Sequence, residues 1–337
     1  MPKSLNCVTH SEHFYDNPDK TKEVIMFTSI EETEIRLKDA AYICSSEIAT
    51  VVFLSAATNK PILVEGPAGV GKTELAKAVS RCLGWDLIRL QCYEGLDEAK
   101  ALYEWEYAKQ LLYTQMMKEK INEVIGGAVT LTEAADKIAA QEDAFFSERF
   151  IQPRPLLKAI SSEKPVVLLL DEVDKSDPEF EAFLLEILSD YQISIPEIGT
   201  RKAAHIPFVI LTSNNYRDMS DALKRRCLHL YIDYPDKDLE SRIVNLKIPA
   251  IQQKLCNQIV ESIQAIRTID LKKKPAISET LDWANALMAL QVEDLSSNVI
   301  LKTLNVIVKH RSDADMVKEN LALVSRQGPK GPRVADG

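Results

Sequence analysis

The sequence predicts an α/β protein in which a doubly wound, mostly parallel sheet is followed by an all-helical domain. Short apolar runs alternate with helical patterns between residues 60 and 235, and this alternation is typical of a parallel sheet with helices on both faces. Beyond Pro235 the strand patterns stop, and helical patterns continue to residue 326. The length of 337 residues also exceeds what one hydrophobic core usually supports, so we expect two domains.

The expected organisation has a core domain at residues 31–235 and a smaller helical domain at 236–326. An extension of residues 1–30 precedes the core. Residues 327–337 combine Gly, Pro and charge, and we expect this tail to be disordered. Within the core, a helical insert is expected at about residues 97–147.

The first half of the core begins with helical periodicity over residues 31–58, where apolar residues recur at spacings near 3.6. A short apolar run at 62–64 is expected to be a buried strand. It is followed by a glycine-rich turn, an Ala-rich helix at 74–83 that Gly84 stops, and a second strand at 86–92.

The second half of the core contains the most apolar run of the chain, which is too short for a helix and is followed by two acids. We expect this run to be the central parallel strand. The expected elements, in chain order, are a long helix over 96–120, a helix over 132–146, the central strand at 165–170, a helix at 179–189, a hairpin over 192–207 and a core strand at 208–212.

Composition excludes several classes of function. The chain has 41 basic and 50 acidic residues and a net charge of -9, which disfavours nucleic acid as the main partner. Its six cysteines are scattered without a CxxC pair, so we expect them to be reduced rather than metal-bound. Neither a membrane-length apolar run nor a secretory leader pattern occurs, so we expect a cytoplasmic protein.

The segment GPAGVGKT matches the phosphate-binding pattern G-x-x-x-x-G-K-[ST]. Glycines let the backbone approach an anion closely, and the following helix adds its positive end. We expect Lys72 to reach the β- and γ-phosphates of ATP and the Thr73 hydroxyl to bind Mg²⁺. The expected nucleotide contacts are Gly66, Pro67, Ala68, Gly69, Val70, Gly71, Lys72, Thr73 and Glu74.

Two carboxylates, Asp171 and Glu172, directly follow the central strand. Ligands of doubly wound sheets lie at the carboxyl ends of the strands, so we expect both beside the glycine-rich loop. Asp171 suits the Mg²⁺ shell, and Glu172 suits the general base that deprotonates the attacking water. The alternative is that the two acids only end a strand at the surface.

The segments VVLLLDEVDK, FVILTSNN and SDALKRRC, in this order after GPAGVGKT, resemble the AAA+ superfamily and, within it, the MoxR-like ATPases. The resemblance covers most of residues 31–235 and implies ATP hydrolysis with Mg²⁺ and a helical lid. It implies that Asn214 helps to place the lytic water. It also implies an arginine finger at Arg226, or at Arg225, that completes a neighbouring subunit's site. A finger acting in this way requires a ring, and we expect a hexamer.

Other positions leave alternatives open. Gln91 is either a polar partner of Glu172 or a plain residue at the edge of the core. Tyr42 and Ile43 are either walls of an adenine site or core packing. The resemblance implies that the hairpin and the helical insert face a ring pore and contact substrate.

The lid departs from the family pattern. MoxR-like proteins usually carry a nucleotide-contacting arginine there, but the comparable stretch reads PAISETLDWANAL, with Glu279 near the expected arginine. Either Arg267 or one of the lysines 272–274 substitutes, or the lid signals differently.

The function expected first is ATP-driven remodelling or cofactor maturation of a client protein, as in MoxR-like chaperones that work with von Willebrand factor A domain proteins. A nucleic-acid motor or clamp loader shares the same core but conflicts with the acidic balance. An ATP-binding switch without hydrolysis conflicts with the intact set of Asp171, Glu172, Asn214 and Arg226. The client stays open.

Overall fold

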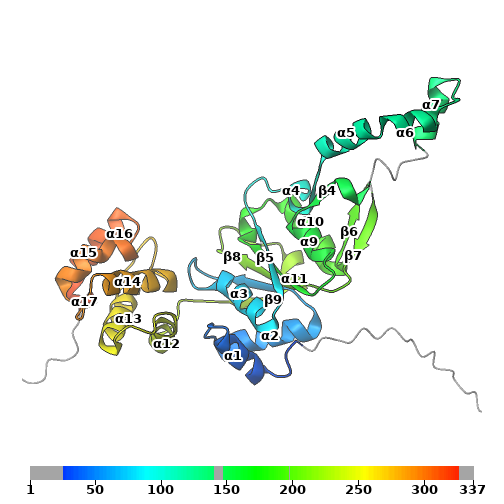
Figure 1. Ribbon diagram of the computed structural model, residues 1–337. Helices are drawn as coiled ribbons and strands as arrows, with labels where there is room; N and C mark the ends of the chain where they lie inside the picture. Colours follow the sequence, from blue (N-terminus) through cyan, green and yellow to red (C-terminus); the bar gives the residue numbers. More distant parts are fainter. Residues whose placement is uncertain (1–25, 140–146, 197, 326–337) are drawn as a thin grey trace, which may run out of the picture.

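The computed structural model describes residues 26–139, 147–196 and 198–325. The predictions for residues 1–25 and for the tail at 327–337 lie outside this part of the chain. Figure 1 shows three parts: a core built around a sheet, a helical arm that projects from it, and a helical domain that follows the core in the chain. None of the described helices has the length and apolar character needed to cross a bilayer.

The core contains a parallel sheet, which confirms the predicted fold class. Its strands pair in the order β2, β5, β8, β1 and β9. Their bounds are β1 (Ile62–Glu65), β2 (Asp86–Gln91), β5 (Val166–Asp171), β8 (Phe208–Ser213) and β9 (Leu228–Tyr231). Strand β9 is absent from the predicted elements because its four residues, LHLY, are too few to establish a period of two.

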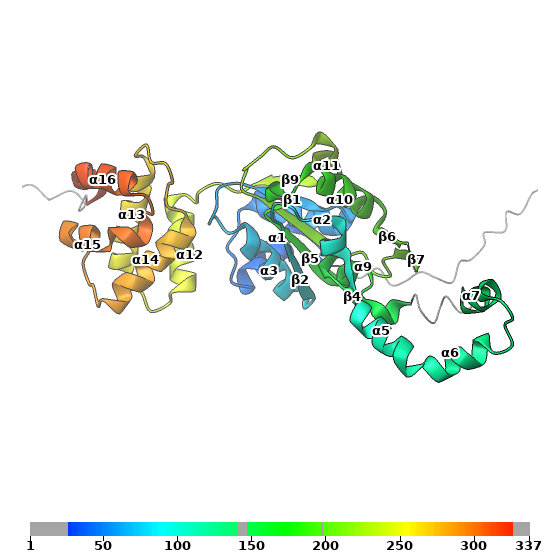
Figure 2. The same cartoon turned by 90° about the horizontal axis from the view of Figure 1, so that it is seen from above.

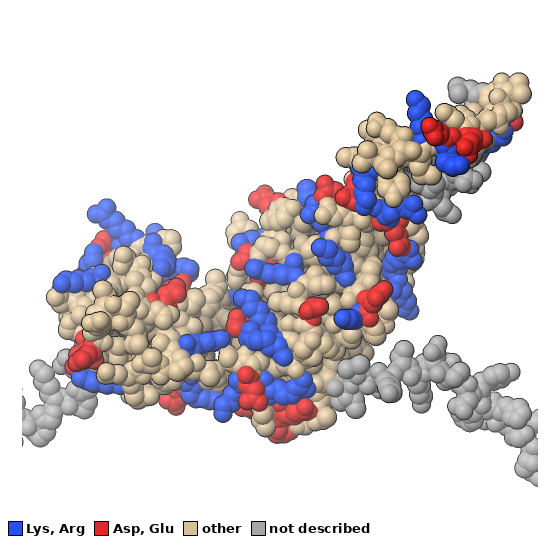
Figure 3. Space-filling view, in the orientation of Figure 1, with Lys and Arg blue, Asp and Glu red and all other residues tan. Residues whose placement is uncertain are grey.

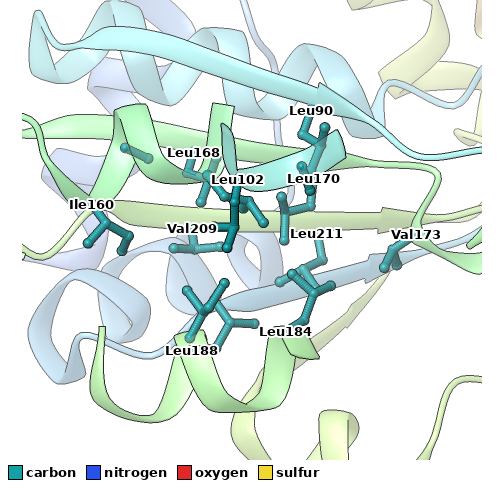
Figure 4. Close-up of a cluster of buried hydrophobic side chains, with 14 of the residues drawn as sticks. Leu90, Leu102, Ile160, Leu168, Leu170, Val173, Leu184, Leu188, Val209 and Leu211 are labelled. Carbon is teal, nitrogen blue, oxygen red and sulfur yellow. The ribbon is translucent and has the colours of Figure 1, made fainter. Parts of the chain in front are cut away.

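Helices cover both faces of the sheet because side chains of the central strand alternate between them. Val167 and Leu169 of β5 pack in one buried cluster, and Leu168 and Leu170 pack in the other. Figure 4 shows the second cluster between the sheet and the helices beside it. The first cluster includes side chains of α1 (Ile30–Asp39), α2 (Ser46–Thr58) and α3 (Lys72–Leu83), and the second those of α4 (Glu98–Leu102), α9 (Pro155–Ile160), α10 (Pro178–Asp190) and α11 (Asp221–Arg226).

The continuous helix predicted over residues 31–58 is wrong, because the chain breaks between α1 and α2. Ala41 takes a left-handed conformation with φ of 58°, which an α-helix does not accommodate. Ser45 then caps α2 by accepting the N–H of Ile48, as serine often does at a helix start. The break leaves Tyr42 and Ile43 in a loop.

The single helix predicted over residues 96–120 is also wrong. Strand β3 (Tyr103–Trp105) interrupts it and pairs antiparallel with β4 (Ile151–Pro153). Aromatic residues favour extended backbone, and the indole of Trp105 lies 6.3 Å from the ring of Phe150. The short helix η1 (Glu148–Phe150) leads into β4.

Beyond β3 the insert forms an arm that extends away from the sheet (Figure 2). It contains α5 (Tyr107–Met116), α6 (Lys118–Ile125) and α7 (Leu131–Ala139). The helix predicted over residues 132–146 corresponds to α7, and its residues 140–146 lie outside the described part. Large apolar side chains of the arm are exposed, namely Tyr107, Leu111, Leu112, Tyr113, Met116, Met117, Val124 and Val129.

The hairpin predicted over residues 192–207 is confirmed. Strands β6 (Gln192–Ile195) and β7 (Gly199–Lys202) pair antiparallel. Ile193 and Ile195 are buried against the core cluster, whereas β7 is exposed along its length. The hairpin therefore has one face that packs and one strand that faces solvent.

The described residues beyond Pro235 form helices only, as the sequence predicts. We call residues 237–324 the lid; they form α12 (Lys237–Lys247), α13 (Gln253–Arg267), α14 (Ile277–Ala289), α15 (Ser297–Ile307), α16 (Arg311–Glu319) and α17 (Leu321–Val324). The lid has its own buried cluster, in which Trp283 is fully buried. Its indole N–H donates to the hydroxyl of Thr303 at 2.8 Å, so the cluster contains no unpaired indole.

Candidate functional site

The glycine-rich loop joins β1 to α3, and α3 begins inside the loop at Lys72. Gly66 has φ of 145° and Gly71 has φ of 103°, conformations that residues with a Cβ atom rarely adopt. A Cβ on Gly66 would lie 2.0 Å from the carbonyl oxygen of Ile232. The loop therefore requires glycine both for its turn and for its contact with the connection after β9.

Lys72 is buried in this loop and is 6% exposed. Its Nζ donates to the carbonyl oxygens of Gly66 and Pro67, each at 2.7 Å. Burial lowers the pKa of Lys72 to about 8, while the negative charges of Asp174, Asp171 and Glu172 act in the opposite direction. A phosphate group would supply this ammonium with the counter-charge that burial demands.

Thr73 and Asp171 meet although 98 residues separate them in sequence. The Thr73 hydroxyl donates to Oδ1 of Asp171 at 3.0 Å and lies 3.3 Å from Oδ2. The Thr212 hydroxyl donates to Oδ1 at 2.5 Å. Hard oxygen ligands of this kind fit Mg²⁺, which is usually held by one or two protein oxygens together with phosphates and water.

No cluster of three His, Cys, Asp or Glu side chains suited to a metal ion occurs among the described residues. In a bound Mg²⁺ nucleotide, phosphates and water would supply most of the oxygens around the ion. Thr73 and Asp171 are the residues that would hold the ion.

Glu172 lies beside this pair with both carboxylate oxygens hydrogen-bonded. Asn214 donates from Nδ2 to Oε1 at 3.1 Å, and Gln91 donates from Nε2 to Oε2 at 3.0 Å. Lys175 also donates to Oε2, at 2.5 Å. The backbone of Glu172 is left-handed, with φ of 56°; such strain in a residue with a side chain is frequent at functional sites.

Asp174 holds the backbone of the segment that carries Asn214. Its carboxylate is 1% exposed, and Oδ2 accepts the backbone N–H groups of Asn214 and Tyr216 at 3.0 and 2.8 Å. Its Oδ1 has no hydrogen-bond partner within the described residues. Asp174 therefore fixes the backbone that carries the Asn214 amide toward Glu172.

Four residues of this network were not singled out from the sequence: Arg89, Thr212, Asp174 and Lys175. Arg89 donates from Nη2 to Oδ2 of Asp171 at 2.5 Å and to Oε1 of Gln91 at 2.6 Å. A pattern signal exists for Thr212, because it is the polar residue that directly follows the apolar run FVIL. Asp174 and Lys175 follow the acidic pair within three residues, whereas Arg89 approaches Asp171 only once β2 and β5 pair.

Two cavities flank the loop. One of about 280 Å³ lies on the phosphate side and is lined by Lys72, Thr73, Asp171, Glu172, Thr212 and Asn214, among others. The other, of about 370 Å³, is mostly apolar and is lined by Tyr42, Ile43, Val70, Ile243, Ile277 and Leu281, among others. The structure thus places Tyr42 and Ile43 on the wall of a cavity next to the loop, where a purine base would adjoin bound phosphates.

The lid meets the loop at Gly69. The backbone N–H of Ser278 donates to the carbonyl oxygen of Gly69 at 3.2 Å, and Ser278 lines both cavities. Lys247 of α12 pairs with Glu74 of α3 at 3.4 Å. The carboxylate of Glu279 accepts the N–H of Ala276 at 3.1 Å, so its role is to begin helix α14.

Arg267, the first candidate for a nucleotide-contacting cation, pairs with a carboxylate inside the lid instead. It is 8% exposed, and its guanidinium pairs with both carboxylate oxygens of Glu240 at 2.7 and 2.8 Å. Of residues 272–274, Lys273 lies 3.4 Å from Oε1 of Glu279. None of these cations lines the two cavities.

Arg225 and Arg226 are exposed at the end of α11 and do not line the phosphate-side cavity. Arg226 donates from Nε to the Ser189 hydroxyl at 2.7 Å and lies 3.4 Å from the carbonyl oxygen of Ala222. The structure therefore does not bring either arginine to the site of its own chain.

Comparisons with known proteins find both relatives and a family model. An uncharacterised protein of Staphylococcus aureus strain NCTC 8325 is 26% identical over 239 residues, which are 69% of this chain and 77% of that protein; an uncharacterised protein of strain COL gives the same values. The Holliday junction branch migration motor RuvB of Thermotoga maritima is 16% identical, with a TM-score of 0.42 over 81% of this chain and 69% of that one. Residues 61–227 match the AAA domain of the dynein-related subfamily. Residues 61–227, which contain the glycine-rich loop, the acidic pair and Asn214, are therefore similar to an AAA domain.

Proposed function

We propose that this chain binds ATP with Mg²⁺ and hydrolyses it to ADP and phosphate. The observation that carries the proposal is the meeting of five side chains, from the ends of strands β5 and β8 and from the start of α3, around one cavity: Lys72, Thr73, Asp171, Glu172 and Asn214. Three of them are charged, which is unusual for the edge of a sheet unless a ligand is bound there. The adjoining apolar cavity has room for a purine base.

The roles follow from chemistry and position. Lys72 and the loop N–H groups bind the phosphates, because the ammonium and the helix start are both positive. Mg²⁺, when bound, would neutralise phosphate charge beside Thr73 and Asp171. Glu172 accepts a proton from the attacking water, and Asn214 orients the Oε1 atom that accepts it.

We further propose that the chain works as a MoxR-like machine that remodels or matures a client protein together with a von Willebrand factor A domain partner. The projecting arm with its exposed apolar side chains supports this, because surfaces of that kind mark protein contacts. Figure 3 shows basic and acidic side chains intermixed over the core. With the net charge of -9, this favours a protein client over a phosphate backbone.

We propose a ring of six copies as the active assembly. Arg226 is exposed and lies outside the cavity of its own chain. This position suits a finger that completes the site of a neighbouring subunit, where it would stabilise transition-state charge. A cytoplasmic location belongs to the same proposal.

The test measures ATP turnover of the full chain alone, with duplex DNA, and with a candidate von Willebrand factor A domain protein. We expect basal turnover that DNA leaves unchanged and that the protein partner raises. Strong stimulation by DNA would overturn the remodelling role and favour a nucleic-acid motor. No turnover under any condition, with ATP still bound, would contradict hydrolysis itself.

A further inference from the structure

Arg89 is a charged residue in the sheet, at the site, without a role in the chemistry described above. It lies on β2, two residues before Gln91, which is in register with Asp171 of β5. Its side chain is 49% exposed, whereas that of Asp171 is 3% exposed. The guanidinium therefore reaches from solvent to a buried carboxylate.

The hydrogen bonds of Asp171 divide between its two oxygens. Oδ1 accepts from Thr212 at 2.5 Å and from Thr73 at 3.0 Å. Oδ2 accepts from Arg89 at 2.5 Å and lies 3.3 Å from the Thr73 hydroxyl. Arg89 thus covers the oxygen that has the fewest other close partners.

A guanidinium and a divalent cation compete for such an oxygen. Both need its lone pairs, and two positive groups at one carboxylate repel each other. The guanidinium has a second acceptor within reach, since Arg89 also donates to Oε1 of Gln91 at 2.6 Å. It can therefore leave Asp171 without losing every partner.

We propose that Arg89 is a positioning residue that neutralises Asp171 and yields this carboxylate to Mg²⁺ when the metal-bound nucleotide enters. The proposal rests on the proposed function, because it assumes that the site takes a Mg²⁺ nucleotide. In this role Arg89 reduces the gain in nucleotide affinity that Mg²⁺ provides, because part of the free energy of Mg²⁺ binding is used to displace the guanidinium.

The test compares wild type and Arg89→Met by equilibrium binding of a fluorescent, non-hydrolysable ATP analogue, once with Mg²⁺ and once with EDTA. The readout is the ratio of the two dissociation constants, EDTA over Mg²⁺. We expect this ratio to rise about tenfold in Arg89→Met, the size of one charge-assisted hydrogen bond. Mg²⁺ no longer competes in the variant, and metal-free phosphates meet an unneutralised Asp171.

The matched control is Arg154→Met. Arg154 has a similarly exposed side chain, 45%, and pairs with Glu104 rather than with a residue of the site, so its ratio should equal that of wild type. A ratio in Arg89→Met that is unchanged or lower overturns the proposal. Arg89→Gln, which keeps a donor and loses the charge, should raise the ratio as well and replaces the methionine variant if that does not fold.

Failure of the proposed function is a separate result. If wild type binds no nucleotide under either condition, the site assignment fails. If wild type binds with a Mg²⁺ advantage that Arg89→Met leaves unchanged, only the role of Arg89 fails.

Discussion

The core and the lid both bury charged side chains, but the surroundings of those side chains differ. In the core, Lys72 and Asp171 are both buried and both line the phosphate-side cavity. In the lid, Arg267 and Glu240 are buried against each other. One charge cluster is open to a ligand, and the other is closed.

The lid cluster is closed because each of its charged groups has several partners inside the lid. Glu240 accepts from Arg267 and, at 2.6 Å, from the Thr280 hydroxyl. Arg267 also donates from Nε to the carbonyl oxygen of Pro275 at 2.7 Å and lies 5.1 Å from the ring centre of Tyr234. Burial of charge thus indicates a ligand site only where the charged groups face a cavity.

The largest expected effect is that of Arg226, a charged residue of the core that lies outside the phosphate-side cavity of its own chain. Arg226→Ala should lower ATP turnover about 10³-fold or more, as removal of an arginine finger does, with little change in ATP affinity. Turnover and nucleotide binding are measured on the same preparation. In rings mixed with subunits that keep Arg226, activity should partly return.

Mixing experiments decide between the two arginines and between the two modes of action. If mixing has no effect, a finger acting between subunits is contradicted. If Arg225→Ala has the loss expected for Arg226→Ala, the finger is the neighbouring residue.

The second effect concerns the closed cluster. Arg267→Met should lower the free energy of unfolding by about 3–5 kcal/mol, because it leaves Glu240 buried without its ion partner. Denaturant unfolding of the full chain, followed by a probe of the lid tryptophan Trp283, measures it. A loss below 1 kcal/mol would show that the lid cluster is not closed.

The third effect is a pH dependence of ATP binding by the open cluster of the core. The pKa of Lys72 is lowered to about 8 by burial, and phosphates bind its protonated form. ATP affinity should therefore be constant below pH 7 and fall as pH rises through 8, by about tenfold per unit well above it. Binding titrations between pH 6 and 9.5 measure this, and a flat profile contradicts the role of Lys72.

The smallest effect is that of an exposed ion pair in the same lid. Lys254 pairs with Asp294 at 2.5 Å, with side chains 63% and 54% exposed. Lys254→Met should leave the denaturation midpoint nearly unchanged, since solvent screens such pairs. Its denaturation curve is the control for Arg267→Met, and a loss as large as that of the buried pair would remove the contrast between them.

Much of the core was predictable because its signals are local. Each of these patterns is contained within ten residues: the apolar runs of β1, β5 and β8, and the glycine-rich loop. The placement of Asp171 beside Thr73 follows from a general rule on the carboxyl ends of parallel strands. The Gln91 contact with Glu172, one of two alternatives from the sequence, is present in the structure.

The rest depends on contacts between distant segments. Residues 96–120 have helical spacing, but β3 exists because Tyr103–Trp105 pairs with a strand about fifty residues later. Arg89 looks like an ordinary surface charge until pairing of β2 with β5 brings it to Asp171. The sequence left Arg267 as a candidate for contacting the nucleotide, because its ion pair with Glu240 joins two different helices and has no local signal.

The most direct test of the central claim separates ATP binding from ATP turnover with two variants. Lys72→Ala should weaken ATP binding by about a hundredfold or more, because it removes the buried ammonium that faces the phosphates. Glu172→Gln should bind ATP as wild type does and lose turnover by about 10³-fold, because an amide does not accept the proton of water. Near-normal turnover in both variants would contradict the assignment of the site.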